Sequence, residues 1–173
     1  MIQVAMLFRL VIVIMVFGIL FGPAKWSYAA PRSGQAAPNF KVSTISGLQV
    51  SMDNYRGHVL VLDFFATWCQ PCRASIPHLV EMNRKYGNQG LQVLGMSADE
   101  DGERVVKAFA DRNHITYPIA LAGETTQVDF GVRSVPVMFV IDKKGRIAEV
   151  FRGFSDEVAR STEQLIKKLL AEK

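Results

Sequence analysis

A pair of closely spaced cysteines behind an apolar segment constrains this chain more than any other feature. Val59–Phe65 is nearly all apolar, which is typical of a strand buried on both faces of a sheet. Cys69-Gln-Pro-Cys72 follows shortly afterwards, where a helix is predicted to begin. These are the only two cysteines of the sequence. Both cysteines therefore lie where a buried strand leads into a helix.

The spacing of the cysteines predicts reversible dithiol–disulfide chemistry. A thiolate at a helix N-terminus is stabilised by the helix dipole and by free backbone N–H groups, which favours Cys69 as the nucleophile. Cys72, one turn later, can attack the mixed disulfide that the first thiolate forms. A zinc site fits less well, because it needs about four ligands, whereas the histidines are scattered at His58, His78 and His114. A purely structural disulfide would close too small a loop to restrain much of the chain.

Residues 1–29 have the layout of a secretory signal peptide. Arg9 precedes the uncharged segment Leu10–Phe21, and Gly22-Pro23 then breaks any helix. Small residues in the last positions predict cleavage after Ala29. The alternative is an uncleaved membrane anchor, in which the apolar region extends back past Arg9. Either outcome exports the folded part, to the periplasm or the extracytoplasmic face of the cytoplasmic membrane.

The rest of the chain, about 144 residues, suits one domain with its own core. We expect a linker over residues 30–38 and a single domain over residues 39–173. Without the leader the chain has 18 basic and 16 acidic residues, and no basic run suggests nucleic acid. Two cysteines are too few for a disulfide-built scaffold. We therefore expect the pair to act on the disulfides of other proteins.

Hydrophobic periodicity and turn residues predict an α/β fold whose sheet is covered on both faces. A short hairpin is expected first, from Phe40 to Ser51. The expected strands are 59–65, 91–97, 117–121, 137–142 and 147–151, and the expected helices are 70–86, 103–113, about 125–130, and one capped by Ser155. The buried stripe of the last helix should consist of Val158, Leu165, Ile166, Leu169 and Leu170.

Asp63 stands inside the apolar segment that leads to the cysteines. A carboxylate in a buried strand is costly unless it is paired, and its pKa should rise. A weakly acidic carboxyl there could accept a proton from Cys72 and return it later, which makes Asp63 a candidate catalytic residue. The alternative is a core aspartate that is bonded to backbone groups.

Four residues around the pair have distinct expected roles. Pro71 falls in the first helical turn, where a missing N–H costs nothing, and it stiffens the pair. Pro77 lies mid-helix, where a proline should kink the helix. Trp68 borders Cys69 and is either a platform that contacts substrates or a half-buried core aromatic. Arg73 either adds positive potential or is simply solvated.

Four segments follow one another in a specific order and spacing: Ala37-Pro-Asn-Phe40, Tyr55 to Arg73, Pro77-His-Leu79, and Phe130 to Asp142. In this they resemble the TlpA/ResA-like branch of the thioredoxin superfamily, a likeness that runs from about Ala36 to Lys173. The resemblance implies a thioredoxin-like fold, with a central mixed sheet and helices on both faces. It also implies an N-terminal β-hairpin and an inserted strand–helix segment near residues 98–120.

The resemblance assigns roles to individual residues. It implies that Cys69 is the exposed nucleophile and Cys72 the buried resolving cysteine. It implies that the Val135–Pro136 peptide is cis, packs beside the disulfide and offers backbone groups of Val135 to an extended substrate. Without it a cis bond would not be predicted, because only ~5% of X–Pro bonds are cis. Pro77 matches the helix-kinking proline of this branch.

Two positions depart from the branch. Many members carry Asn where this chain has Asp63, whereas Asp resembles thioredoxin itself. Many members also carry Glu three residues after the second cysteine, where this chain has Ser75. That Glu is thought to tune the thiols and select the partner, so its absence weakens an assignment to cytochrome c maturation in particular.

We therefore expect an exported thiol–disulfide oxidoreductase that reduces protein disulfides, in cytochrome c maturation or a related extracytoplasmic thiol homeostasis. Its only redox group is the Cys69–Cys72 disulfide, with no metal and no other cofactor. Its expected partners are disulfide-containing proteins and, from the resemblance, a membrane thiol-electron donor. A thiol peroxidase is the first alternative, although Phe65–Cys69 lacks the pattern Pro-x-x-x-Thr/Ser-x-x-Cys. A non-catalytic binding module is the second, but it does not need the cysteine pair.

Overall fold

A five-stranded mixed sheet forms the centre of the protein. The computed structural model describes residues 30–172, and its strands follow the order β5-β4-β3-β6-β7. β3 is parallel to β4, and β4 to β5, whereas β6 is antiparallel to both β3 and β7. The strands are β3 (Val59–Phe65), β4 (Leu91–Ser97), β5 (Ile119–Leu121), β6 (Val137–Ile141) and β7 (Ile147–Arg152). The central mixed sheet that the resemblance implies is confirmed.

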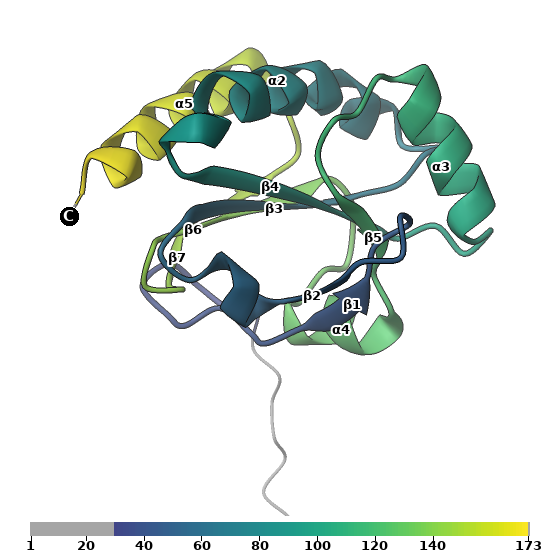
Figure 1. Cartoon of the computed structure of the whole chain (residues 1–173), viewed down its shortest axis with the longest axis horizontal. Helices are drawn as coiled ribbons and strands as arrows, with labels where there is room; N and C mark the ends of the chain where they lie inside the picture. The colour runs from purple at the N-terminus through teal and green to yellow at the C-terminus, as the bar shows by residue number, and fades with distance from the viewer. Residues whose placement is uncertain (1–29, 173) are drawn as a thin grey trace, which may run out of the picture.

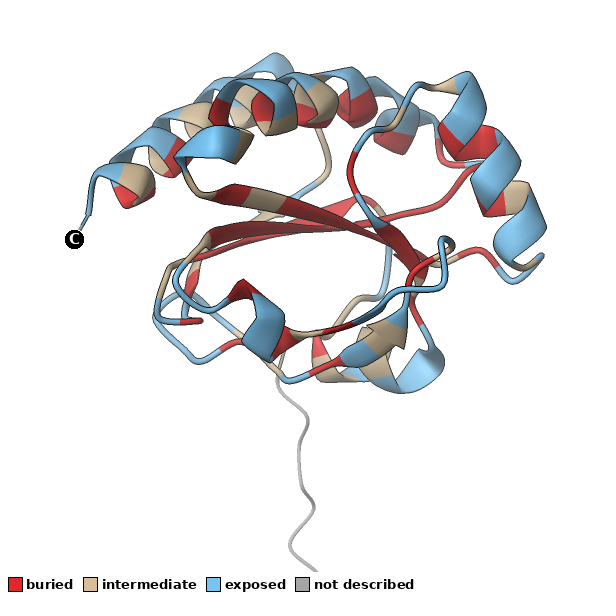
Figure 2. Ribbon diagram, in the orientation of Figure 1, coloured by how far each residue is buried: buried red, intermediate tan, exposed pale blue. Residues whose placement is uncertain are grey.

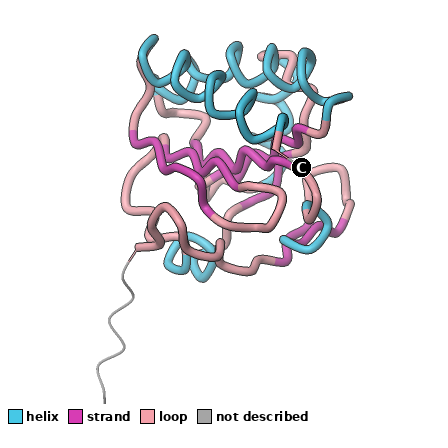
Figure 3. The backbone as a smooth tube through the Cα atoms, turned by 90° about the vertical axis from the view of Figure 1, so that its left-hand side faces the viewer, coloured by secondary structure: helices cyan, strands magenta, loops and turns pink. Residues whose placement is uncertain are grey.

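Helices and a hairpin cover the two faces of this sheet (Figure 1). One face carries the three longer helices, which are α2 (Gln70–Tyr86), α3 (Glu103–Arg112) and α5 (Asp156–Ala171). The other face carries the short helix α4 (Glu124–Asp129) and the hairpin of β1 (Lys41–Ser43) and β2 (Gln49–Ser51). Figure 3 shows the same layers from the side, with most helical residues on one side of the strands. Two 3-10 turns complete the elements, η1 (Met52–Tyr55) and η2 (Gly87–Gln89).

β3 separates two apolar cores. All of its residues are buried (Figure 2). Neighbouring strands flank both of its edges, the longer helices cover one of its faces, and the hairpin with α4 covers the other. Side chains alternate along a strand, so Val61 and Phe65 pack with the core beneath α2, α3 and α5. Leu62 and Phe64 pack with the core beneath the hairpin and α4. The nearly unbroken apolar run of Val59–Phe65 is therefore explained by burial on both faces of the sheet.

The N-terminal part lies against the edges of the central sheet. In the predicted hairpin, which is confirmed, Val42 pairs with Val50. An isolated bridge between Thr44 and Ala120 joins the hairpin to β5. The segment expected to be a linker also makes contacts with the domain, since the N–H of Gly34 donates to the carbonyl of Ile147 at 2.7 Å. The predicted leader, residues 1–29, lies outside the described residues.

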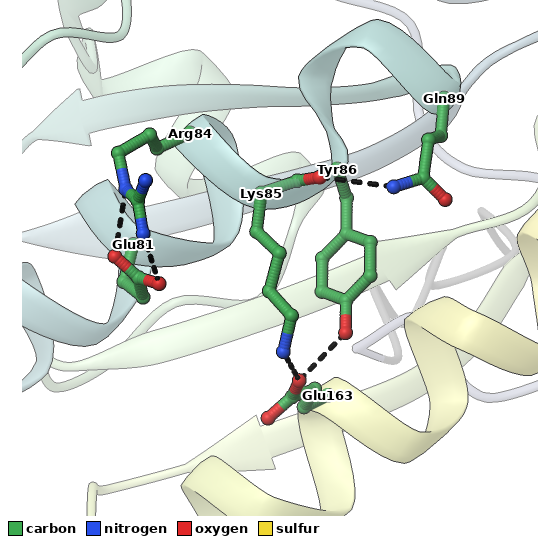
Figure 4. Close-up of polar contacts among 6 residues, drawn as sticks. All are labelled: Glu81, Arg84, Lys85, Tyr86, Gln89 and Glu163. Carbon is green, nitrogen blue, oxygen red and sulfur yellow. Dashed lines mark hydrogen bonds and ion pairs between the residues drawn. The ribbon is translucent and has the colours of Figure 1, made fainter.

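Polar contacts tie the end of α2 to α5 (Figure 4). The carboxylate of Glu163 on α5 accepts hydrogen bonds from Lys85 Nζ at 2.7 Å and from Tyr86 Oη at 2.6 Å. A second pair, Glu81 and Arg84, lies within α2 itself. Such exposed pairs typically contribute only about 0–1 kcal/mol. The apolar core between the helices and the sheet therefore carries most of the stabilisation of this layer.

The inner face of α5 contains one residue that the sequence did not predict. Ile166 and Leu169 are buried, and the other residues of the predicted stripe are half-buried. Thr162 is also fully buried, although a threonine was not expected there. Ser155 caps the helix as predicted, because its side chain accepts from the N–H of Val158.

None of the helices within residues 30–172 is both long and apolar enough to cross a membrane.

We expect Thr162→Val to stabilise the protein by about 1–2 kcal/mol. Thr162 is fully buried and its Oγ1 has no hydrogen-bond partner among the described residues. Burying an unpaired hydroxyl costs ~1–3 kcal/mol, and valine has a similar shape. Urea unfolding of both proteins measures the difference.

As the matched control, Thr162→Ser keeps the hydroxyl, loses a methyl group and should be less stable than the wild type. A valine variant no more stable than the wild type would contradict the unpaired state of this hydroxyl.

Candidate active site

The two cysteines form a disulfide at the start of α2. Cys69 is the N-cap residue of the helix and Cys72 lies in its first turn, with their Cα atoms 5.3 Å apart. The backbone N–H of Cys72 donates to Cys69 Sγ at 3.2 Å. A thiolate at this sulfur would accept the same hydrogen bond and face the positive end of the helix dipole. The site can therefore stabilise a sulfur anion at Cys69 once the disulfide is reduced.

Exposed residues flank the nearly buried disulfide, and Trp68 is the large aromatic among them. Cys72 has no exposed surface and Cys69 only 5% in this oxidised state, so the nucleophile is less accessible than the resemblance implies. Trp68 is 68% exposed. This exposure excludes the interpretation of Trp68 as a half-buried core aromatic. A large exposed aromatic beside a nearly buried disulfide is suited to contact a partner.

Asp99 holds the loop that presents the disulfide, and sequence reasoning missed it. Its buried carboxylate accepts from the N–H of Thr67 at 2.9 Å, from Thr67 Oγ1 and from Ser97 Oγ at 2.7 Å. The N–H of Cys69 in turn donates to the carbonyl of Ala66, which directly follows β3. The sequence did contain a signal for this contact. Asp99 follows β4 and Thr67 follows β3, and the C-terminal ends of parallel strands meet at one edge of a sheet.

The cis peptide implied by the resemblance is present between Val135 and Pro136. Pro136 is buried and precedes β6, whose first residue, Val137, pairs with Phe64 near the end of β3. Val135 is half-buried and packs against both apolar cores, one of which contains Cys69 and Cys72. This loop therefore lies at the same end of the sheet as the disulfide.

Asp63 lies in the core on the face of the sheet that carries Cys72. Its strand neighbours Val61 and Phe65 belong to the same apolar cluster as Cys72, and side chains two residues apart share a face. Asp63 is 1% exposed, and its Oδ2 has no hydrogen-bond partner among the described residues. Burial raises its pKa from 3.8 to about 7. A group with this pKa can take up and release a proton near neutral pH.

Tyr117 packs at Gly95, opposite Asp63, and it too was missed from the sequence. Gly95 on β4 stands directly opposite Asp63, so a side chain at Gly95 would lie on the same face. A Cβ atom there would come within 3.4 Å of the Tyr117 ring and 3.1 Å of the Phe65 ring. The two rings fill the space that Gly95 leaves open beside the carboxyl. Burial and, secondly, the charge of Asp63 raise the pKa of Tyr117 well above 10.0.

The first two turns of α2 contain both prolines and a serine. Pro71 lies in the first turn as predicted, and Pro77 lies inside the helix, which continues to Tyr86. A proline at position 77 cannot donate to the carbonyl four residues earlier. Ser75 is buried, and its hydroxyl donates to the carbonyl of Cys72 at 2.8 Å. Ser75 therefore adds no charge beside Cys72.

We expect Asp63→Asn to be more stable than the wild type near pH 8 but not near pH 4. The folded pKa is about 7 and the unfolded pKa about 4, so between these values the folded wild type binds a proton that the unfolded chain has lost. Wild-type stability therefore falls as the pH rises through this window, and asparagine removes a loss of up to ~4 kcal/mol.

Urea unfolding of the oxidised proteins at several pH values measures this difference. Asp101→Asn is the matched control, because Asp101 is exposed and the same change there should not stabilise the protein near pH 8. An Asp63→Asn effect that does not vary with pH would contradict the raised pKa.

Comparisons with known proteins agree with this geometry. The model of the AhpC/TSA family matches residues 33–150. The thioredoxin-like protein YneN of Bacillus subtilis is 32% identical over 123 residues, which cover 70% of this chain and 72% of YneN. The thiol-disulfide oxidoreductase ResA of Bacillus cereus is 28% identical over 170 residues, which cover 95% of this chain and 96% of ResA.

A solved structure agrees as well. The thiol:disulfide interchange protein of the thioredoxin family from Chlorobium tepidum superposes with a TM-score of 0.72 at 28% identity, covering 83% of this chain and 99% of that protein. The fold, the cysteine pair at the helix start and the relatives lead to one identification. This chain belongs to the AhpC/TSA family, and it is a TlpA/ResA-like thiol–disulfide oxidoreductase of the thioredoxin superfamily.

Proposed function

We propose that this enzyme reduces disulfide bonds of proteins outside the cytoplasm. The observation that carries the proposal is the arrangement at the start of α2, where Cys69 Sγ accepts an N–H bond and Cys72 is buried one turn later. The N-cap position favours the thiolate that attacks a substrate. The buried second thiol and the carboxyl of Asp63 on the same face supply the groups for release.

The proposed reaction has two steps. The Cys69 thiolate attacks one sulfur of the substrate disulfide, forms a mixed disulfide and displaces the other substrate sulfur as a thiolate. The thiol of Cys72 then gives its proton to Asp63 and attacks Cys69, which releases the second substrate thiolate and forms the Cys69–Cys72 disulfide. The proton passes from Asp63 to a released thiolate or to water. Two electrons move from the enzyme dithiol to the substrate.

Continued turnover needs a reductant for the Cys69–Cys72 disulfide. We propose a thiol-electron donor in the membrane, consistent with the resemblance to the TlpA/ResA-like branch, and no cofactor besides the disulfide. The proposed substrates are disulfide-containing proteins rather than nucleic acids. The exposed Trp68 and the loop with the cis Val135–Pro136 bond would contact an extended substrate segment.

The location proposed for the enzyme is the periplasm or the extracytoplasmic face of the membrane. The sequence of residues 1–29, with its charged start and uncharged apolar centre, supports export. N-terminal sequencing of the protein from its own cells tests this point. A chain that begins at Ala30 indicates a cleaved signal peptide, and an intact Met1 in the membrane fraction indicates a tethered enzyme. Retention of the whole chain in the cytoplasm would contradict export.

Substrate identity separates general thiol reduction from cytochrome c maturation. The buried Ser75, at the position where many relatives have glutamate, favours general reduction. Cys72→Ser should trap mixed disulfides on Cys69, because the resolving thiol is missing. Mass spectrometry of the captured proteins distinguishes apocytochrome c from other exported proteins. A Cys69→Ser, Cys72→Ser double variant is the control for capture without thiol chemistry, and equal capture by it would favour a non-catalytic binding module.

Activity on two kinds of substrate separates the oxidoreductase from a peroxidase. We expect reduction of insulin disulfides with dithiothreitol as the electron donor, and its loss in Cys69→Ser. Turnover of hydroperoxide without insulin reduction would overturn the proposal in favour of a thiol peroxidase.

We expect brief alkylation of the reduced protein near neutral pH to modify Cys69 and not Cys72. Cys69 lies at the helix terminus, where the dipole acts, whereas Cys72 has no exposed surface. Mass mapping of the modified peptides gives the ratio of labelled Cys69 to labelled Cys72. Preferential labelling of Cys72 would reverse the assignment of nucleophile and resolving cysteine.

A further inference from the structure

A basic cleft lies between the first turn of α2, which also holds Cys72, and the end of α3. Its volume is about 410 Å³, and it is lined by Arg73, Phe109, Arg112 and Asn113. Arg73 directly follows Cys72 in the chain. The cleft therefore shares the first turn of α2 with the disulfide, although neither cysteine lines it, and α3 of the inserted segment forms its other wall.

The guanidinium of Arg73 is held in place by two contacts. Its Nε donates to the carbonyl of Thr67 at 2.8 Å, and its Cζ lies 5.8 Å from the centre of the Phe109 ring. Phe109 is almost fully buried, so it is a fixed platform for the cation. No hydrogen bond within residues 30–172 uses the two terminal nitrogens of Arg73. This leaves the N–H fork of the guanidinium free for an outside acceptor.

The second cation of the cleft is also without a counter-ion. Arg112 is exposed at the end of α3, and neither it nor Arg73 forms an ion pair within the described part of the chain. None of the four residues that line the cleft is acidic. The side-chain nitrogen of Asn113 donates to the carbonyl of Phe109 at 2.8 Å, which fixes this wall of the cleft. Two guanidinium groups thus share a concave surface without a carboxylate of this chain.

We propose that this cleft is a subsite for an acidic side chain of the substrate protein, located a few residues from the cysteine that Cys69 attacks. This inference rests on the proposed reduction of protein disulfides. The planar fork of arginine binds a carboxylate through two parallel hydrogen bonds, which a single ammonium group cannot do. Because Arg73 is held in advance, little side-chain freedom is lost on binding. The subsite would select disulfides that lie next to Asp or Glu.

A pair of disulfide peptides tests the subsite. The two peptides carry the same disulfide and differ only in one flanking residue, Glu or Lys. We expect the purified reduced enzyme to react faster with the Glu peptide, on the order of tenfold at low ionic strength. About 0.5 M NaCl should remove most of this preference, because salt screens exposed charges.

The decisive variant is Arg112→Glu, which should abolish or reverse the preference. Lys107→Glu is the matched control, since it makes the same charge change on an exposed position of the same helix outside the cleft. It should keep the wild-type preference. Arg112→Gln provides a neutral variant with an intermediate expected preference in case the charge reversal destabilises α3, and thermal unfolding reports whether each variant is folded.

The outcomes distinguish the two proposals. A wild-type enzyme that reduces neither peptide would contradict the proposed function itself. Equal rates for the Glu and Lys peptides would leave that function intact and overturn the subsite. An equal loss of preference in Lys107→Glu and Arg112→Glu would also overturn the subsite, because the selectivity would then follow the overall charge of the protein.

Discussion

The complete burial of β3 is the constraint on which the active site depends. Strands pair with both of its edges, and an apolar core packs on each of its faces. Its C-terminal end therefore has a fixed position, and so does the short loop from Ala66 to Cys69. Asp99 adds a second anchor by binding Thr67 in that loop. The helix that begins at Cys69 thus starts at a defined point above the sheet.

The same burial sets the protonation of the site. The proposed mechanism needs opposite environments at two groups, since Cys69 must favour an anion and Asp63 must be able to hold a proton. The helix N-terminus supplies the first environment through dipoles and N–H groups. The core supplies the second by burying Asp63, with the rings of Phe65 and Tyr117 packed at Gly95 opposite it. We expect the buried carboxyl to lower stability at neutral pH, a cost that functional sites often carry.

The elements around the cysteines were predictable because their signals are local. The apolar run of β3, the cysteine spacing and Pro71 follow one another within a few residues, and the hairpins are signalled by alternation and turn residues. The cis bond at Pro136 was expected only from the resemblance to a known branch. The raised pKa of Asp63 follows from its place in that apolar run.

Other site residues depend on contacts between distant segments and could not be predicted. The place of Tyr117 in the site is recognisable only once the register places Gly95 opposite Asp63. The bond from Arg73 to Thr67 and its place over Phe109 require that α3 lies beside α2. The sequence did not predict the burial of Thr162, because this burial depends on the contact between α5 and the sheet. Periodicity predicts which face of an element is buried but not which residue lies opposite.

In the proposed mechanism, Asp63 takes the proton of Cys72 when the substrate is released. Stopped-flow kinetics of the reduced Asp63→Asn enzyme with a disulfide peptide resolve the attack by Cys69 from the attack by Cys72. We expect the first step to keep its wild-type rate, because the Cys69 thiolate is already stabilised at the helix N-terminus. The second step should slow by about 10²-fold, as is typical when a general base is lost. Wild-type rates for both steps in the asparagine variant would contradict the claim and make Asp63 a structural residue.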